Sequence, residues 1–380
     1  MRLEQLLDAT TRARVPALVL GPPGVGKTAA IRGWAARRRL QCWTVIASLR
    51  EPSDFAGLPI VDPPQARAGG VAGLPSVTFA PPRFAVEAAA HGGVIFLDEL
   101  TTAPPAVQAA MLRAVVDVAF GDLQLDPERV TLVAAANPPE EAAGGWDLAP
   151  PLANRFVHHT YALAPQDWVE SFPRYWGGAP RLVFGGRELD PVKWGKARAT
   201  VAAFVRVRPN LLLQVPRDSA TRGQAWPSPR TWDYCSRLLA SVEQAGGGAL
   251  DALNLLAGCV GEPAALELRT WLAELDLPDP EVLLADPDAY RHPQRGDQAY
   301  AILSSVSQAA IENLTPGRWH AAWQVLASAA QAGGADVAAA AARDLARART
   351  ADLDTPVREL RHFFPILEAA GLLHGAAQAA

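Results

Sequence analysis

The chain has 380 residues and a formal net charge of −4 at pH 7. At about 150 residues per domain, this length predicts two or three domains. Hydrophobic residues make up 49% of the sequence and charged residues 19%, which excludes a disordered chain and supplies a sizeable core. The slightly acidic balance argues against a protein that coats nucleic acid or lies on a membrane surface.

The cysteine and hydropathy patterns predict where the protein works. Its three cysteines, Cys42, Cys235 and Cys259, are far apart and lack the CxxC spacing of a zinc site or a disulfide framework. They fit a reducing compartment. No apolar run reaches 18 residues, and the first ten residues contain no apolar signal segment. We therefore expect a soluble, cytoplasmic protein that does not insert into a membrane.

The first 165 residues alternate short apolar runs with helical patterns, which is typical of βαβ units and a parallel sheet. The runs are mostly unalternated, as in strands that are buried on both faces. We expect strands at residues 17–20, 42–47, 94–97, 130–136 and 156–163, and helices at 27–39, 82–90 and 104–118, the last capped by Thr102. The prediction for 1–165 is an α/β core with helices on both faces of the sheet.

The pattern changes from residue 166 onward, where strand signals fade and helical segments dominate. A second break, rich in proline, covers residues 277–293. Beyond it we expect helices at 298–314, 319–332, 335–349 and 357–370. The sequence thus predicts an α-helical domain over 166–276 and an α-helical C-terminal extension over 277–380.

A phosphate-binding pattern, GxxxxGK[ST], directly follows the first predicted strand and precedes a predicted helix. It consists of Gly21, Pro22, Pro23, Gly24, Val25, Gly26, Lys27 and Thr28. Glycines let such a loop turn its amides inward, and the following helix adds positive potential at its N-terminus. Lys27 is expected to reach the β- and γ-phosphates of ATP, and the Thr28 hydroxyl is expected to bind Mg²⁺.

Two further strands end in polar side chains. The strand at 94–97 is followed by Asp98, which is placed to hold Mg²⁺, and by Glu99, which can orient and polarise an attacking water. The strand at 130–136 is followed by Asn137, at the edge where open α/β sheets bind ligands. A hydrolase needs a carboxylate at position 99, whereas a P-loop kinase does not. The pattern therefore favours hydrolysis of ATP.

Taken in order, these motifs resemble those of AAA+ ATPases, and the segments between them resemble the MoxR-type group of that family. The general resemblance rests on the P-loop, Leu97 to Leu100, Ala135 to Pro138 and Leu152 to Phe156. The resemblance to the MoxR type rests on residues 50–57, 77–81 and 101–108, the first two of which look like that group's helix-2 insert at about 50–80. It covers residues 1–165 well and 166–275 loosely.

The resemblance implies roles for several polar residues. Asn137 would be the sensor 1 residue, and Arg155 would be an arginine finger that enters the nucleotide site of a neighbouring subunit. Arg230, near the start of a predicted helix in the lid (166–276), would be the sensor 2 residue, with Arg222 or Arg217 as substitutes. Guanidinium groups suit both arginine roles because they can neutralise charge that develops on the γ-phosphoryl group.

The resemblance also implies a ring-shaped homo-oligomer, usually a hexamer. Relatives of this type act as chaperone-like factors in metal or cofactor insertion and in complex maturation, often with a partner that contains a von Willebrand A domain. The insert at 50–80 and a hairpin-like turn at 120–123 are candidate contacts for a client protein, although both could be passive surface hairpins.

Two other functions stay open at this point. A DNA-translocating motor would need a basic pore surface, which the net charge and the acidic insert residues Glu51, Asp54 and Asp62 disfavour. A nucleotide-gated assembly platform that barely hydrolyses would depend on Lys27 but not on Glu99. A P-loop small-molecule kinase would leave Glu99, Asn137 and the long helical half unexplained.

Overall fold

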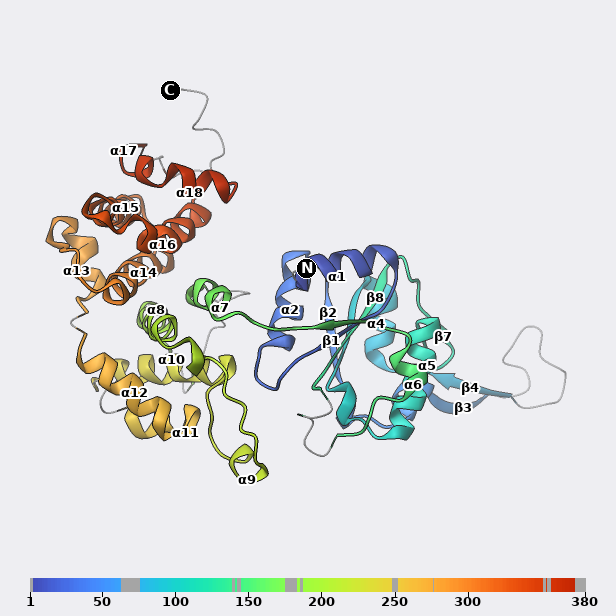
Figure 1. Ribbon diagram of the computed structural model, residues 1–380. Helices are drawn as coiled ribbons and strands as arrows, with labels where there is room; N and C mark the ends of the chain where they lie inside the picture. Colours follow the sequence, from blue (N-terminus) through green and yellow to red (C-terminus); the bar gives the residue numbers. More distant parts are fainter. Residues whose placement is uncertain are drawn as a thin grey trace. The chain divides into compact units, whose positions relative to one another are not determined.

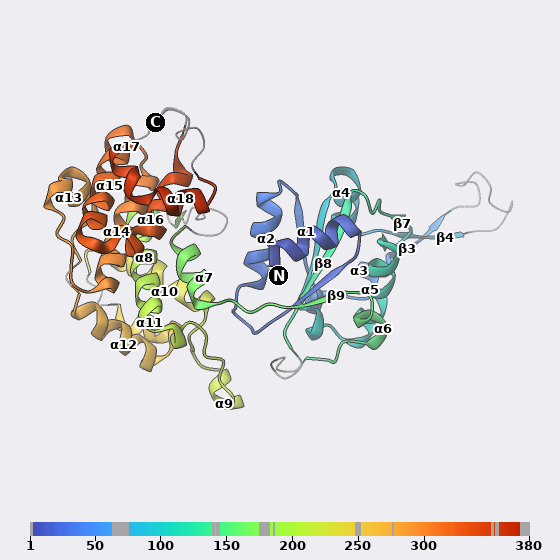
Figure 2. The ribbon, with the colours of Figure 1, turned by 45° about the horizontal axis from the view of Figure 1, so that its top comes forward.

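The computed structural model divides the chain into two compact units, residues 1–162 and 163–380 (Figures 1 and 2). It describes residues 3–62, 76–138, 141, 145–174, 183–184, 187–247, 252–275, 277–350, 353 and 357–372. The first unit is an α/β domain and the second is mainly helical. This confirms the predicted fold class.

The first unit is built on a five-stranded parallel sheet in the order β2-β5-β8-β1-β9. Its strands are β1 (Ala17–Leu20), β2 (Cys42–Ile46), β5 (Gly93–Asp98), β8 (Val130–Ala136) and β9 (Val157–Thr160). The central strands β5 and β8 are almost wholly buried, which explains their unbroken apolar sequences. All five predicted strands form, within a few residues of their expected ends.

Helices cover both faces of this sheet (Figures 1 and 2). On one side lie α1 (Leu3–Ala13) and α2 (Lys27–Arg37), and on the other lie α4 (Arg83–His91) and α5 (Pro105–Asp117). Two short helices, α3 (Ser53–Ala56) and α6 (Pro150–Ala153), complete the layer on the side of α5. A core of apolar side chains from α4, α5 and the strands fills the space between them.

One predicted helix cap is wrong. The helix α5 begins at Pro105 with Pro104 at its N-cap position, and no side chain caps it. Thr102 instead lies in a 3₁₀ turn, Leu100–Thr102, where its hydroxyl donates a hydrogen bond to the carbonyl oxygen of Glu99. The two consecutive prolines, which lack amide hydrogens, begin the helix two residues later than the cap pattern indicates.

Two antiparallel hairpins pack beside the sheet. The larger pairs β3 (Leu58–Asp62) with β4 (Ser76–Ala80), and the smaller pairs β6 (Ala119–Phe120) with β7 (Leu123–Gln124). The amide of Gly121 donates to Phe55, and Asp122 and Phe79 exchange two hydrogen bonds. The predicted insert thus forms a hairpin that is joined to the turn at 120–123, while its middle, residues 63–75, lies outside the described residues.

The second unit contains a long series of helices. The principal ones are α7 (Pro165–Ser171), α8 (Pro191–Val207), α10 (Pro229–Gln244), α11 (Leu253–Val260), α12 (Glu262–Ala273), α13 (Pro280–Ala285), α14 (Gly296–Glu312), α15 (Pro316–Ala329) and α16 (Ala335–Ala348). Shorter pieces are α9 (Ser219–Arg222), α17 (Val357–Leu360), α18 (Phe364–Ala369) and the strand pair β10 (Val183–Phe184) and β11 (Arg187–Glu188). The unit has two apolar cores, and α14 contributes to both.

By length and composition, the segment Pro316–Ala348 is apolar enough to cross a membrane, with 44% of its most apolar window buried inside the structure. It consists of two helices, α15 and α16, separated by a kink at Gly333, whose φ is +89°. Trp319 and Trp323, four residues apart on α15, are completely buried in one of the two cores. Packing within the second unit therefore explains the apolar character of this segment.

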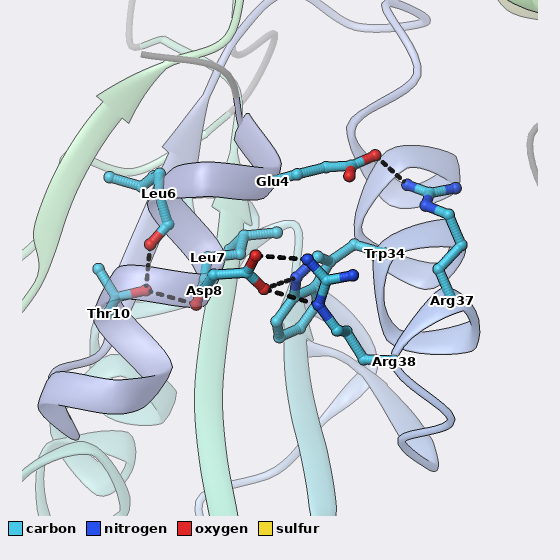
Figure 3. Close-up of polar contacts among 8 residues, drawn as sticks. All are labelled: Glu4, Leu6, Leu7, Asp8, Thr10, Trp34, Arg37 and Arg38. Carbon is cyan, nitrogen blue, oxygen red and sulfur yellow. Dashed lines mark hydrogen bonds and ion pairs between the residues drawn. The ribbon is translucent and has the colours of Figure 1, made fainter. Parts of the chain in front are cut away.

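The helix α1 is attached to α2 by a polar cluster (Figure 3). The carboxylate of Asp8 accepts hydrogen bonds from Trp34 at 2.9 Å and from Arg38 at 3.0 and 2.5 Å, and Glu4 pairs with Arg37. These bonds to Arg38, and then to Trp34, lower the pKa of Asp8 below its ordinary value of 3.8. Arg37, the last residue of α2, and Arg38, its C-cap residue, are therefore each paired with a carboxylate of α1.

We expect Asp8→Asn to lower the free energy of unfolding of the first unit by about 1–3 kcal/mol. The change weakens the hydrogen bonds that the carboxylate accepts from Arg38 and from the buried Trp34. The loss should be largest above pH 3.8 and should vanish as the pH falls and protonates Asp8. Urea unfolding of both chains at several pH values measures it. Glu4→Gln, which breaks an exposed pair, should cost about 0–1 kcal/mol; equal losses would contradict this account.

Candidate nucleotide site

Polar groups gather at the carboxyl-terminal edge of the sheet, where adjacent strands end. The strand order puts β8 between β5 and β1, with Ala136 opposite Leu20 at the end of β1. The P-loop follows β1, Asp98 ends β5, and Asn137 follows β8. Parallel strands deliver their following residues to one edge, so side chains more than 100 positions apart become neighbours here.

The P-loop has the backbone that its glycines allow. Gly24 and Gly26 have φ values of +75° and +100°, a region that favours glycine. Gly26 is also the N-cap residue of α2, so no side chain occupies the start of this helix. A Cβ atom at Gly21 would lie 2.7 Å from the carbonyl oxygen of Tyr161. The glycines thus allow a tight loop and leave the N-terminus of α2 without a capping side chain, and an uncapped helix N-terminus suits an anion.

The side chain of Lys27 lies within this loop and is 8% exposed. Its ammonium donates hydrogen bonds to the carbonyl oxygens of Gly21 at 2.6 Å and Pro22 at 3.0 Å, and to Asn137 Oδ1 at 2.8 Å. These three acceptors hold the ammonium in place inside the loop. An anionic phosphate oxygen would bind the ammonium more strongly, because hydrogen bonds between charged groups are about twice as strong as neutral ones.

Thr28 and Asp98 form the second contact of the site. The Thr28 hydroxyl donates to Asp98 Oδ2 at 2.7 Å, and Asp98 Oδ1 accepts from the amide of Glu99 at 3.0 Å. A hydroxyl and a carboxylate oxygen are hard donors of the kind that Mg²⁺ takes alongside waters and phosphate oxygens. The oxygen atoms of Thr28 and Asp98 are therefore suitable ligands for the predicted Mg²⁺ site.

Glu99 is exposed and has an unusual backbone conformation, with φ +58° and ψ +42°. Its carboxylate Oε2 accepts a hydrogen bond from the hydroxyl of Ser48 at 2.9 Å. Ser48 lies in the 3₁₀ turn Ala47–Leu49 that follows β2. Non-glycine residues in the left-handed region are uncommon, and such strain is found most often at functional sites.

Sequence reasoning missed Ser48 and a second residue, Thr101. The Thr101 hydroxyl donates to the backbone oxygen of Asn137 at 3.2 Å, so the turn after β5 holds the turn after β8. The position of Ser48, two residues beyond the end of β2, is the signal that could have pointed to it, because β2 belongs to the same sheet edge.

The two predicted arginines lie on segments other than those that form this cluster. Arg155 is exposed, follows α6, and donates to the carbonyl oxygen of Pro151 in its own turn. Arg230 is exposed in the first turn of α10 in the second unit, behind a capping box formed by Ser228 and Thr231. Of the possible substitutes, Arg222 donates to Pro216, and Arg217 is exposed.

One known family matches the α/β core in sequence. Residues 16–156 match the family described as the AAA domain of the dynein-related subfamily. No curated protein matches the chain in sequence. Among solved structures, the chain is similar to NtrX from Brucella abortus, with 18% identity and a TM-score of 0.34 over 92% of this chain and 69% of that one. It is also similar to a variant of RuvB from Thermotoga maritima, with 16% identity and a TM-score of 0.35 over 87% and 80%.

Proposed function

We propose that this chain, whose residues 16–156 form an AAA domain, hydrolyses ATP and uses the cycle to remodel or activate a partner protein, as MoxR-type proteins do. The observation that carries the proposal is the cluster of Lys27, Thr28, Asp98 and Asn137, which three strands bring together at one edge of the sheet. These four side chains provide the groups that bind a nucleoside triphosphate and its metal ion.

In this proposal, ATP binds with its phosphates against the P-loop amides and the start of α2. Lys27 exchanges its carbonyl partners in the loop for phosphate oxygens while Asn137 keeps the ammonium oriented. Mg²⁺, held by Thr28 and Asp98, would neutralise charge on the phosphates. Glu99, one residue beyond Asp98, then accepts a proton from the attacking water.

The hydrogen bond between Ser48 and Glu99 is proposed to restrain the Glu99 carboxylate before it takes part in hydrolysis. While Glu99 Oε2 accepts the Ser48 hydroxyl, that oxygen has one less lone pair with which to orient a water. We expect Ser48→Ala to raise the basal turnover about two- to tenfold, because one hydrogen bond of this kind contributes about 0.5–1.5 kcal/mol. Steady-state phosphate release measures it, and Ser48→Thr, which keeps the hydroxyl, is the matched control. A lower turnover in Ser48→Ala would mean that Ser48 orients the base instead of restraining it.

Arg155 is proposed to act on a neighbouring subunit, in a ring that is usually a hexamer. Two observations support this role: Arg155 is exposed, and its hydrogen bond is to its own turn. Arg230, at the start of α10, is proposed to touch the γ-phosphate from the helical unit as sensor 2 and so to couple hydrolysis to rigid-body movement. Its exposed position in a capped first turn suits a side chain that must reach a ligand.

The hairpin β3–β4 is the proposed contact for a client or adaptor, which could contain a von Willebrand A domain. In its register, Pro59 lies opposite Phe79 and Val61 opposite Val77, so these four side chains share one face. Val61 is 68% exposed, Val77 48% and Phe79 41%. An exposed apolar patch of this kind typically marks a protein-binding surface.

Two alternative functions were left open by the sequence, a DNA-translocating motor and a nucleotide-gated assembly platform. The DNA-translocating motor stays disfavoured by the net charge and by the acidic insert residues Glu51, Asp54 and Asp62. The nucleotide-gated platform would bind ATP at the same site, and it differs from the proposed function only in that its activity would not need Glu99.

We propose a cytoplasmic location, since three thiols outside disulfide bonds are typical of a reducing compartment.

The proposal is tested by ATP binding and hydrolysis in Lys27→Ala. We expect this variant to lose ATP binding at concentrations that saturate the unaltered chain, and to release no phosphate above background. Lys196→Ala is the matched control, because Lys196 pairs with Glu243 in the second unit and should leave both properties unchanged. If Lys27→Ala still binds and hydrolyses ATP, the cluster is not a nucleotide site.

A further inference from the structure

A cavity of about 550 Å³ opens beside strand β2 in the first unit. It is lined by residues of α2, of β2 and of α4. Two guanidinium groups face it, Arg32 from α2 and Arg50 from the segment after β2, together with two aromatic rings, Trp43 and Phe84. Pockets that bind organic ligands usually have volumes of roughly 300–1,000 Å³. The proposed function uses none of these four side chains, so the cavity is a candidate for a second binding site.

The backbone of β2 also faces this cavity. Among the described residues, β5 is the one strand that pairs with β2, which therefore forms an edge of the sheet. The amide of Val94 on β5 donates to the carbonyl oxygen of Gln41. Because the backbone groups of a parallel strand point to alternate sides, the amides and carbonyls of Cys42 and Thr44 point outward, and both residues line the cavity.

The sequence of β2 contains no feature that would prevent pairing with another chain. Many edge strands carry prolines or charged residues, which discourage the addition of a further strand. The segment Cys42–Ile46 has neither, and its residues are aromatic, aliphatic or small. The strand can therefore accept a further strand along its outer edge.

The two arginines lie on opposite sides of this edge. Arg32 donates two hydrogen bonds to the Thr44 hydroxyl, at 3.0 and 2.9 Å, on the side of α2. Arg50 lies over the ring of Phe84, 5.9 Å from its centroid, on the side of α4. None of the described residues that line the cavity is acidic, and the carboxylate of Asp54 lies 3.9 Å from Arg50, too far for a hydrogen bond. Both guanidinium groups can therefore bind a carboxylate that a ligand supplies.

A strand that paired with β2 would present its side chains alternately to these two sides. One side chain would point toward Arg32, and the next toward Arg50. The side of α4 also offers apolar surface, because Trp43 contacts this helix through a hydrogen bond from its indole nitrogen to Glu87 at 3.0 Å. A segment with two adjacent carboxylates, flanked by residues that favour strands, would therefore match both the charges and the backbone of this edge.

We propose that the edge of β2 binds an extended acidic segment of a partner protein, which adds a strand to the sheet and places adjacent carboxylates on Arg32 and Arg50. In recognition of this kind, main-chain hydrogen bonds give affinity and side-chain pockets give specificity. An acidic segment fits because the lining carries two positive charges and no carboxylate. The site shares no residue with the P-loop cluster or with the hairpin β3–β4, and binding at it does not depend on ATP hydrolysis.

The test measures the binding of synthetic peptides to the full-length chain in the absence of nucleotide. The probe is a fluorescein-labelled peptide, Thr-Val-Thr-Glu-Glu-Val-Thr-Val, whose binding is followed by fluorescence anisotropy. We expect saturable binding, and an affinity lower by about tenfold or more when glutamine replaces both glutamates, because the charge-assisted hydrogen bonds are lost.

Two further peptides test whether the backbone takes part. They carry N-methyl groups on alternate amides, one at the odd positions and the other at the even positions. Because only one of these sets of amides would face β2, one peptide should lose binding and the other should retain it. Both experiments use the unaltered chain, so a folding defect cannot explain their results.

Variants of the chain locate the site. Arg32→Ala and Arg50→Ala should each weaken binding of the acidic peptide by about tenfold, with little effect on the glutamine peptide. Arg14→Ala is the matched control and should bind normally, because Arg14 pairs with Glu128 and does not line the cavity. Bound peptide should also slow alkylation of Cys42, measured under mildly alkaline conditions because burial raises the pKa of this thiol.

Two results would overturn the proposal. One is the absence of binding between the unaltered chain and the acidic peptide, or equal binding of the glutamine peptide. The other is equal binding of both N-methylated peptides and their parent, which would mean that the site holds carboxylates without adding a strand. ATP turnover is not part of the readout, so failure here is distinct from failure of the proposed function.

Discussion

Glu99→Gln is expected to bind ATP as tightly as the unaltered chain and to hydrolyse it about 10²–10⁴-fold more slowly, the usual loss when a general base is removed. Glutamine keeps the size of the side chain and can still accept the hydrogen bond from Ser48, but it cannot take a proton from water. Because Glu99 is exposed and its proposed role is in the chemical step, nucleotide binding should not change. Equilibrium binding of a fluorescent ATP analogue and steady-state phosphate release measure the two properties.

Glu128→Gln is a matched control for this experiment, since Glu128 is an exposed glutamate that pairs with Arg14 away from the cluster. It should retain both properties. If Glu99→Gln hydrolyses ATP at the unaltered rate, Glu99 is not the base. If the unaltered chain hydrolyses ATP only at background rate and Glu99→Gln still activates the partner protein, the assembly platform is the better description.

Arg155→Ala is expected to retain ATP binding and to lose about 10³–10⁵-fold in turnover, the range typical of arginine fingers. The guanidinium would stabilise charge that develops on the γ-phosphoryl group in the transition state and would contribute little to the ground state. Arg155→Lys should recover little of this activity, because an ammonium lacks the planar fork of a guanidinium. The same binding and turnover assays apply.

Arg14→Ala provides the control, because Arg14 is an exposed arginine of the same unit that pairs with Glu128. It should turn over ATP normally. A turnover in Arg155→Ala within a few fold of the unaltered chain would contradict the finger role. Arg222 and Arg217 are not alternative fingers, since they are candidates only for the sensor 2 role.

The sequence predicted the sheet and the cluster because both follow from local patterns. The five apolar runs are strands buried between helices, and a strand that ends in a parallel sheet delivers its next residue to a common edge. The approach of Lys27 to Asn137 and of Thr28 to Asp98 follows from the strand order. Their distances could not be predicted, because they depend on packing between segments that are remote in sequence.

Other features depend on interactions that no local pattern carries. The left-handed backbone of Glu99 and its bond to Ser48 come from the meeting of two turns that are 51 residues apart. The cap predicted at Thr102 was wrong because two prolines moved the start of α5. Tertiary contact decides the first of these features, whereas the second depends on the two prolines beside the predicted cap.

The most direct measurement for the central claim, a nucleotide site completed by a neighbouring subunit, is the ATPase activity of two inactive variants mixed together. Lys27→Ala lacks a working P-loop but still carries Arg155, and Arg155→Ala carries an intact P-loop but no finger. In an equal mixture that exchanges subunits, half of all sites keep Lys27 and half of those have a neighbour with Arg155, so activity should recover to about a quarter of the unaltered level. If the mixture stays as inactive as its two components after subunit exchange, Arg155 does not act across a subunit boundary and the account is wrong.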